Sequence, residues 1–302
     1  MRLLIRAPMG LPVACLLAAE FLLGHPEPAA ASATADVTYT CLDFSDAFAR
    51  RDYPAASLDS SVNRPFASGS VELTASGDAQ VPARGGVKLP THGAAGGVST
   101  AGVSVPSFDF CTASGGSLVS VIVEGKDTSD PGASGNTDVY FAIELDVTLE
   151  FRNDNQLGAF NAFAGLDLAT PFGFDVLDLS AGDGSLDVPP ELTVENLSSG
   201  GVSRYRISGV TSVATQLRYG PYSRNLVNSM FYAGGEFETD EVGGDVAGFA
   251  AASALDTLRY RIISRNPDVS FRFVSVPEPA GGALALAALA ALASLAGRRR
   301  SV

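Results

Sequence analysis

The stretch IELDVTLEF, residues 143–151, decides the fold class. Apolar side chains occupy every second position from Ile143 to Phe151, and Glu, Asp and Thr occupy the positions between them. Because successive side chains of a strand point to opposite faces, this alternation places one face in a core and the other in water. Half-exposed strands of this kind are typical of antiparallel sheets. The stretch therefore predicts an antiparallel β protein.

Other short runs on either side of this stretch also have strand character. Further strands are expected at 36–41, 70–76, 117–125, 191–197, 202–208, 257–264 and 268–276. Turns rich in Gly, Asn, Asp, Ser and Pro separate them, as in Arg265-Asn266-Pro267-Asp268. Short helices are expected at 45–51 and 225–233. Many short strands without regular strand–helix alternation predict an all-β, antiparallel β-sandwich with a jelly-roll-like arrangement.

The stretch from Ser76 to Gly116 is rich in Gly, Ala and Ser and alternates only weakly. It predicts long loops with one or two edge strands. The whole body, residues 34–276, shows no convincing internal repeat and no clear domain boundary. The sequence leaves open whether the body is one β unit or two stacked ones.

The C-terminal segment 280–297 contains eighteen residues without a charge. As a helix it would be about 27 Å long, close to the thickness of the hydrocarbon core of a membrane. Arg298, Arg299 and Arg300 follow at once, and arginine beside a membrane helix tends to stay in the cytoplasm. The segment therefore predicts a transmembrane helix with the body on the other side of the membrane.

Three features in order, Pro277-Glu278-Pro279, the apolar helix and the arginine cluster, resemble the PEP-CTERM sorting signal of Gram-negative bacteria. The resemblance covers residues 277–302 only. It implies that an exosortase is the processing partner and removes the tail. It also implies a bacterium that makes exopolysaccharide or a biofilm matrix. The alternative is an ordinary C-terminal anchor that contains PEP by chance.

The N-terminus resembles a secretory signal peptide, residues 1–33. Arg2 and Arg6 form a basic region, the stretch 11–24 is mostly apolar, and Ala31-Ser32-Ala33 fits an A-x-A cleavage site. The mature chain is then expected to start near Thr34. Together the two terminal signals predict export across the inner membrane, brief anchoring by the helix, and release to the cell surface or the extracellular matrix.

Removal of the signal peptide leaves two cysteines, Cys41 and Cys111. An exported protein folds where disulfides form, so these two are expected to be bonded. The bond would close a loop of about 70 residues and stabilise the fold by about 4 kcal/mol. The alternative is two separate buried thiols.

The net charge of −13 argues against nucleic acids and anionic membranes as partners, and it could attract divalent cations. Calcium is the one cofactor that the sequence leaves open, because oxygen ligands on flexible loops suit it. The candidate ligands in the segment GKDTSDPGASGNTD are Asp127, Asp130, Asn136 and Asp138, and a weaker pair is Asp183 and Asp187. Neither set matches a defined calcium loop. The alternative is that these residues only make turns.

The segment RYGPYSRN places two tyrosines and two arginines around a Gly-Pro turn. Tyrosine can stack on a sugar ring, and arginine can bind an acidic polysaccharide. The candidate glycan-binding residues are Arg218, Tyr219, Tyr222 and Arg224. The alternative is a plain hairpin with partly buried tyrosines, and the absence of Trp weakens the case for a dedicated glycan-binding module.

No catalytic residues are predicted. After residue 33 the chain has one histidine, His92, which lies in a glycine-rich stretch without a G-x-S-x-G motif and is read as a bystander in a loop. The leading hypothesis is a structural or adhesive surface protein associated with exopolysaccharide or biofilm. One alternative is a calcium-dependent or glycan-binding module, and another is a polysaccharide hydrolase that uses a carboxylate pair.

Overall fold

The structure is a computed structural model. It describes residues 31–41, 44–52, 55–66, 69–82, 89–104, 109–154, 158–182, 185–239 and 245–274. The sorting motif Pro277-Glu278-Pro279, the segment 280–302 and residues 1–30 of the expected signal peptide lie outside these ranges. Within the ranges, no helix is long and apolar enough to cross a membrane.

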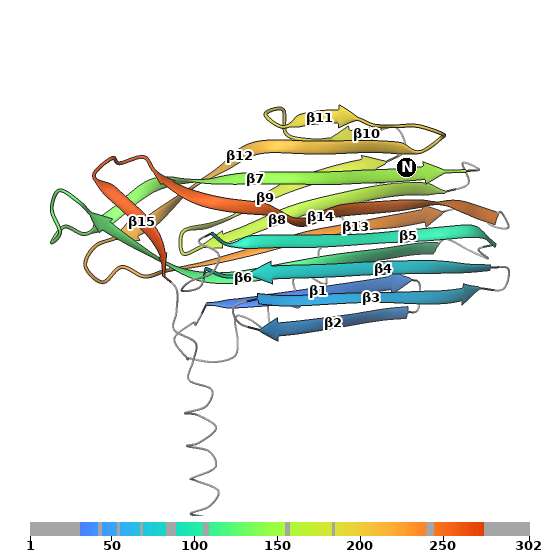
Figure 1. Ribbon diagram of the computed structural model, residues 1–302, viewed down its shortest axis with the longest axis horizontal. Coiled ribbons are helices and arrows are strands. Elements are labelled where there is room, and N and C mark those ends of the chain that lie inside the picture. The colour runs from blue at the N-terminus through green and yellow to red at the C-terminus, as the bar shows by residue number, and fades with distance from the viewer. Residues whose placement is uncertain are drawn as a thin grey trace, which may run out of the picture.

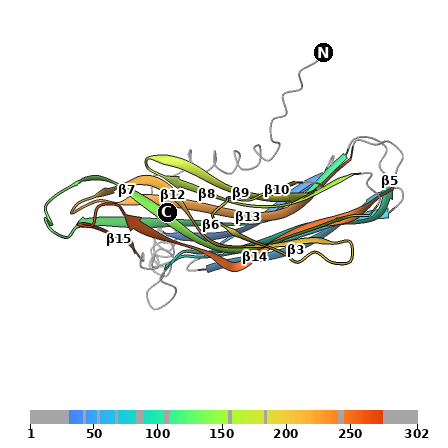
Figure 2. The ribbon, with the colours of Figure 1, turned by 90° about the horizontal axis from the view of Figure 1, so that it is seen from above.

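The described residues form fifteen strands in two antiparallel sheets, which stack face to face as a β-sandwich (Figures 1 and 2). Sheet A consists of β1 (Ser32–Cys41), β2 (Phe44–Asp52), β6 (Asp109–Asp127), β8 (Ala159–Thr170), β9 (Gly173–Gly182), β10 (Ser185–Asp187), β13 (Asn225–Thr239) and β15 (Val269–Val274). Sheet B consists of β3 (Ala55–Phe66), β4 (Gly69–Gln80), β5 (Thr91–Ser104), β7 (Gly135–Asn153), β11 (Thr193–Asn196), β12 (Ser203–Tyr219) and β14 (Asp245–Ser264). The all-β class and the antiparallel pairing are confirmed.

The strand order is β10-β9-β8-β13-β6-β1-β2 across sheet A, where β15 also pairs with β6, and β11-β12-β7-β14-β5-β4-β3 across sheet B. The stretch IELDVTLEF lies in β7, inside sheet B. Ile143, Val147 and Leu149 are fully buried, whereas Glu144 is exposed. The apolar face of β7 therefore packs into the core between the sheets, as the alternation predicts.

The prediction of two short helices is wrong, because both segments are strands. Residues 45–51 lie in β2, and residues 225–233 lie in β13. In β13 the side chains of Asn225, Val227, Ser229, Phe231 and Ala233 are buried and those between them are partly exposed. This period of two is typical of a strand. The sequence does not show it as an alternation of apolar and polar residues, because two of the buried positions are the polar Asn225 and Ser229.

The glycine-rich stretch 76–116 also differs from expectation. Most of its described residues belong to β4, β5 and β6, and β5 lies in the interior of sheet B between β14 and β4. A side-chain carbon added at Gly96 would lie only 2.7 Å from Ala113 O and 2.8 Å from Ala233 O, which belong to sheet A. The small residues therefore let the two backbones approach closely, a role that weak alternation does not reveal.

The predicted disulfide is confirmed: Cys41 on β1 is bonded to Cys111 on β6. The two residues are direct partners in the β1–β6 ladder, with their Cα atoms 4.1 Å apart, and both are buried. The bond joins neighbouring strands of sheet A that are 70 residues apart in the chain.

Both ends of the described body lie on the same side of β6. β1 begins at Ser32, which pairs with Ser120, and β15 ends at Val274, which pairs with Ile122. β13 occupies the other side of β6 over this region. The chain therefore enters and leaves the sandwich at neighbouring positions on one strand.

Candidate functional site

Three turns that cross between the sheets lie together at one end of the sandwich (Figure 1). They join β6 to β7, β12 to β13 and β14 to β15. Backbone hydrogen bonds tie them to each other and to β6: Thr128 N donates to Asp268 O at 2.6 Å, and Gly220 N donates to Gly125 O at 2.9 Å. We call residues 127–138, 216–225 and 264–269 the three-turn end. The stronger set of sequence-predicted calcium ligands and the predicted glycan-binding residues both fall on it.

The β6–β7 turn uses its carboxylates to hold its own backbone. Asp127 Oδ1 accepts from Ser129 N at 2.9 Å, Ser129 Oγ at 2.7 Å and Asp130 N at 2.9 Å. These hydrogen bonds, from the Asp130 amide first, lower the pKa of Asp127. Asp130 Oδ1 accepts from Gly132 N at 3.0 Å. Both carboxylates thus stabilise the conformation of the turn.

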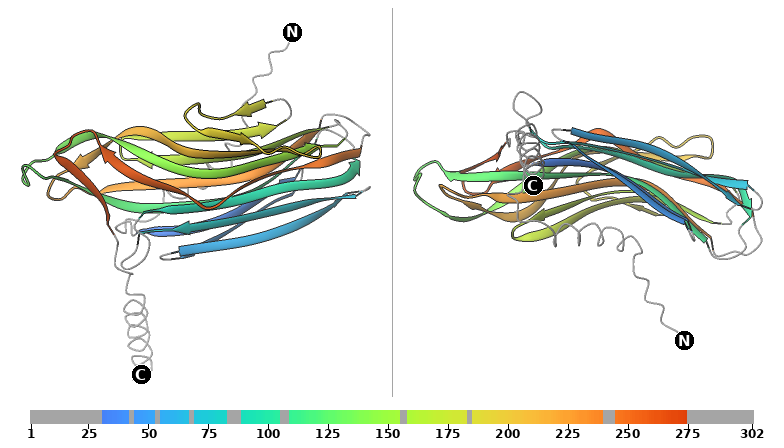
Figure 3. Two further views of the ribbon diagram at one scale, coloured as in Figure 1. Left: turned by 45° about the horizontal axis from the view of Figure 1, so that its top comes forward. Right: turned by 90° about the horizontal axis from the view of Figure 1, so that it is seen from below.

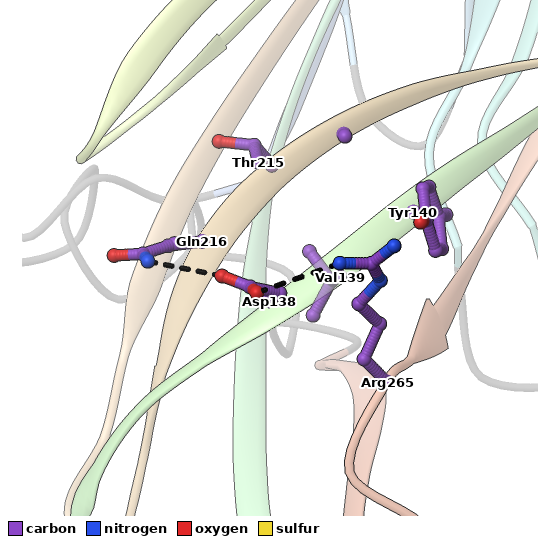
Figure 4. Close-up of a pocket in the computed structure, with 7 residues that line it drawn as sticks. Asp138, Val139, Tyr140, Thr215, Gln216 and Arg265 are labelled. Atoms are coloured by element: carbon purple, nitrogen blue, oxygen red, sulfur yellow. Dashed lines mark hydrogen bonds and ion pairs between the residues drawn. The ribbon is translucent and has the colours of Figure 1, made fainter.

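Asp138 lies on β7, and its carboxylate contacts side chains of other segments instead of the backbone of its own turn. Its Oδ1 accepts from Gln216 Nε2 at 3.0 Å, and its Oδ2 lies 3.8 Å from Arg265 Nη1 (Figure 4). Across the described ranges, no three residues of the types His, Cys, Asp or Glu form a group that could hold a metal ion. The structure therefore does not gather Asp127, Asp130 and Asp138 as ligands. Asp187 is exposed, and Asp183 lies outside the described residues.

The predicted glycan residues adjoin the predicted calcium segment. In the β7–β12 ladder, Arg218 pairs with Asn136 and Tyr219 pairs with Gly135. Arg224 is exposed, and Tyr222 is 95% exposed at the tip of the Gly-Pro turn. Two stretches that lie far apart in the sequence thus form one continuous surface.

This turn is held firmly although its tip is exposed. The buried amide of Asn225 donates to Val123 O at 3.1 Å and to Arg218 O at 2.9 Å, and its oxygen accepts from Arg218 N at 2.9 Å. Ser223 Oγ donates to Gly125 O at 2.8 Å. Tyr222 therefore lies at the tip of a loop whose conformation these hydrogen bonds fix.

An open pocket of about 320 Å³ lies at the three-turn end (Figure 4). Its polar wall consists of Asp138, Gln216 and Arg265, and Tyr140 forms its aromatic wall. The Arg265 guanidinium carbon lies 4.8 Å from the centre of the Tyr140 ring. A second such contact lies at the same end, where the Arg218 guanidinium carbon is 5.3 Å from the centre of the Phe172 ring. Neither Arg265 nor Tyr140 stands out in the sequence as a ligand.

A polar row crosses the face of sheet A that points away from sheet B. Paired residues along it are Asp36, Gly116, Tyr232, Gly165 and Asp178. The Tyr232 ring occupies the space over Gly165, and its hydroxyl donates to Asp178 Oδ1 at 2.8 Å. Burial, and then this hydrogen bond, raises the pKa of Tyr232. The row brings five strands together, so no local sequence pattern indicates it.

Two carboxyl groups on this face hold protons more tightly than usual. Burial raises the pKa of Asp36 to about 6. Burial and, to a smaller extent, the charge of Asp178 raise the pKa of Asp167 to about 6. The face is therefore less negative in mild acid than its composition suggests.

His92 lies in the interior of the sandwich, on β5, and not in a loop. Its Nδ1 is 2.9 Å from Ser117 Oγ, and its Nε2 is 2.8 Å from Ser229 Oγ, which in turn lies 3.0 Å from Tyr260 OH. The network joins β5 and β14 of sheet B to β6 and β13 of sheet A. Burial lowers the pKa of His92 to about 4. The partners are hydroxyl groups and the Ser117 backbone carbonyl, so the arrangement is that of a structural bridge between the sheets.

Comparison with known proteins places the chain in no family. No family matches its sequence, and no curated protein is similar to it. Among solved structures, the NetB toxin of Clostridium perfringens in its membrane inserted form covers 73% of this chain and 100% of its own, at 7% identity and a TM-score of 0.13. A TM-score this low carries no argument about fold or function.

Proposed function

We propose that the protein is exported, processed by an exosortase and delivered to the surface or extracellular matrix of a Gram-negative bacterium, where it has a structural or adhesive, non-enzymatic role. The observation that carries the proposal is the buried disulfide between Cys41 and Cys111. Such bonds persist in oxidising compartments and are rare in the cytosol. The PEP-CTERM resemblance of residues 277–302 supplies the sorting route.

The position of the chain ends also supports this route. Ser32 and Val274 lie beside neighbouring residues of β6, so any segments that precede and follow the body leave it at one place. A body held at one point can be released intact when the peptide is cut there. The jelly-roll-like classification is a further proposal, supported by the chain crossing repeatedly between the sheets.

The processing is tested by the intact mass of the protein recovered from the cell-surface fraction. The expected mass lacks the residues that follow the sorting motif. A variant with Pro277, Glu278 and Pro279 all replaced by Ala should keep residues 280–302 and stay in the membrane fraction. Surface protein that still contains 280–302 would contradict processing. A cytosolic location of a reporter fused before Pro277 would contradict export.

The second candidate function is binding of an acidic glycan at the three-turn end. The observation that favours it is the pair of arginine–aromatic contacts, Arg265 with Tyr140 and Arg218 with Phe172, beside the exposed Tyr222. Guanidinium groups bind carboxylates, and an exposed phenol ring can stack on a sugar. The net charge of the chain opposes such binding, so local contacts must dominate.

Glycan binding is tested with alginate as the acidic probe. Tyr222→Ala and Arg265→Ala should each weaken binding at least fivefold. Arg206→Ala is the matched control, because Arg206 lies on the same strand β12 but is paired with Asp146 away from the three-turn end. Equal binding by all three variants would contradict the proposal.

The calcium alternative predicts a rise in the melting temperature on adding calcium, because a ligand that binds only the folded state stabilises it. The sequence-predicted ligands are Asp127, Asp130, Asn136 and Asp138, although the described structure does not gather the three carboxylates around one point. Asp127→Asn should abolish the rise. No shift of the wild-type chain at millimolar calcium would remove this alternative and leave the glycan proposal standing.

A further inference from the structure

The two sides of the sandwich end in very different edge strands. On one side the edges are β10 and β11, of three and four residues. On the other side they are β2 and β3, of nine and twelve residues. Among the described strands, β2 pairs with β1 alone and lies outermost in sheet A (Figures 1 and 3). Short edges block further pairing, whereas a long edge presents a row of unpaired N–H and C=O groups.

We propose that β2 is a self-recognition edge, where it pairs antiparallel with β2 of a second copy of this chain. In the proposed register, Phe48 lies opposite Phe48 of the second copy on a two-fold axis. This register overlaps the full strand 44–52, since residues whose numbers sum to 96 then face each other. It continues sheet A across the two copies through main-chain hydrogen bonds, as in β-strand addition.

The charges of β2 fit this register. It places Asp46 opposite Arg50 of the second copy, and by symmetry Arg50 opposite Asp46, on either side of the Phe48 pair. These three side chains share one face of the strand, because they are two residues apart. Opposite charges and aromatic pairs directly across an antiparallel ladder stabilise it.

Neighbouring symmetric registers lose this fit. A two-fold axis at Ala49 would place Asp46 opposite Asp52 of the second copy. An axis at Ala47 would place Asp46 opposite Phe48. Only the axis at Phe48 combines full overlap with two opposite-charge pairs, so the sequence of β2 selects one register.

The side chains concerned are available within one copy. Phe48 is 44% exposed. Arg50 contacts Asp52 at 3.5 Å, but both side chains are at least half exposed, and such pairs contribute little to stability. Asp46 Oδ1 accepts from the neighbouring Ala47 N at 2.9 Å. Arg50 can therefore turn to the second copy at little cost.

The proposed contact has two-fold symmetry, so it closes on itself and gives a dimer and not a filament. The short edges at β10 and β11 fit this outcome, since they offer little template for further growth. The inference is independent of the sorting proposal, because it concerns only the folded body.

Charge reversal tests the proposal on the full chain in a non-ionic detergent, with the dimer dissociation constant measured by analytical ultracentrifugation. The wild-type chain should form dimers. Asp46→Arg and Arg50→Asp should each weaken dimerisation at least tenfold, because each places like charges opposite one another. The double variant Asp46→Arg with Arg50→Asp restores both pairs and should return to within threefold of wild type.

Three results would overturn the proposal: a wild-type chain that is monomeric at millimolar concentration, single variants that dimerise like wild type, or a double variant that stays as weak as the singles. Asp46 is half-buried and Arg50 is exposed, so circular dichroism should show the same fold in every variant.

Cross-linking tests the register itself, in a background with Cys15→Ser. Phe48→Cys places two thiols on the two-fold axis, where directly opposed Cα atoms lie about 4.5–5.5 Å apart, and should form an inter-chain disulfide on mild oxidation. Ser45→Cys is the control, because residue 45 faces residue 51 of the second copy and its thiols should stay apart. Equal cross-linking of the two variants would contradict the register.

Discussion

A single buried residue, His92, makes the stability of the fold depend on pH. Its pKa is about 4 in the fold and 6.5 in its ordinary state, so the unfolded chain binds the proton first on acidification. Its contribution is present above pH 6.5 and is lost as the pH falls towards 4. The pKa difference corresponds to about 3 kcal/mol.

We predict that the free energy of unfolding of wild type minus that of His92→Gln falls by about 3 kcal/mol from pH 7 to pH 4, measured by urea denaturation. The raised pKa values of Asp36 and Asp167 act in the opposite direction. The contribution of each carboxyl group to the stability of the fold is lost as the pH rises from about 4 to about 6. They are present in both chains and cancel in the difference. A difference that is constant with pH would show that His92 is solvated.

At the scale of elements, glycine sets the spacing between the sheets. A side-chain carbon at Gly115 on β6 would collide with the backbone oxygens of Ser76 and Ala95 on sheet B. We predict that Gly115→Ala lowers the free energy of unfolding by about 2–3 kcal/mol, because the sheets must separate. In Gly173→Ala, the matched control, the new carbon would lie 3.9 Å from Thr215 Oγ1, so the change should stay within about 1 kcal/mol. Equal effects in denaturant melts would contradict close sheet packing.

The same glycines explain how far the sequence could predict the structure. β7 and β15 were predictable because large apolar side chains alternate with polar ones. β5 was not, because Gly and Ala pack by allowing backbone contact and leave no alternation to detect. The disulfide was predictable from the number of cysteines that follow the expected signal peptide.

The candidate site was predictable only in pieces. Tyr222 and Asp138 belong to segments that the sequence singles out for their composition. Their adjacency depends on β7 pairing with β12, which no local pattern indicates. The stacking of Arg265 on Tyr140 joins two segments more than a hundred residues apart, and composition marks neither residue.

In the whole molecule, the three proposals concern three separate regions. The chain enters and leaves beside β6, the self-recognition edge is β2, and the candidate glycan site is the three-turn end. β1 lies between the first two regions, so the entry strand also supports the edge. The N-terminal residues of β1 therefore contribute to the stability of the proposed edge.

β1 begins two residues before the expected mature start at Thr34. Ser32 pairs with Ser120, and Ala33 pairs with both Val119 and Asp52 and is fully buried. A chain that starts at Thr34 loses these ladder positions and exposes the apolar surface that Ala33 covers, so we predict it to be less stable than one that starts at Ser32 by about 1–2 kcal/mol. Cleavage after Ala31 keeps the strand complete, and Ala29-Ala30-Ala31 also presents small residues at the required positions. N-terminal sequencing of surface material should therefore find Ser32 first. Equal stability of the two chains in denaturant, together with a start at Thr34, would mean that β1 forms without its first two residues.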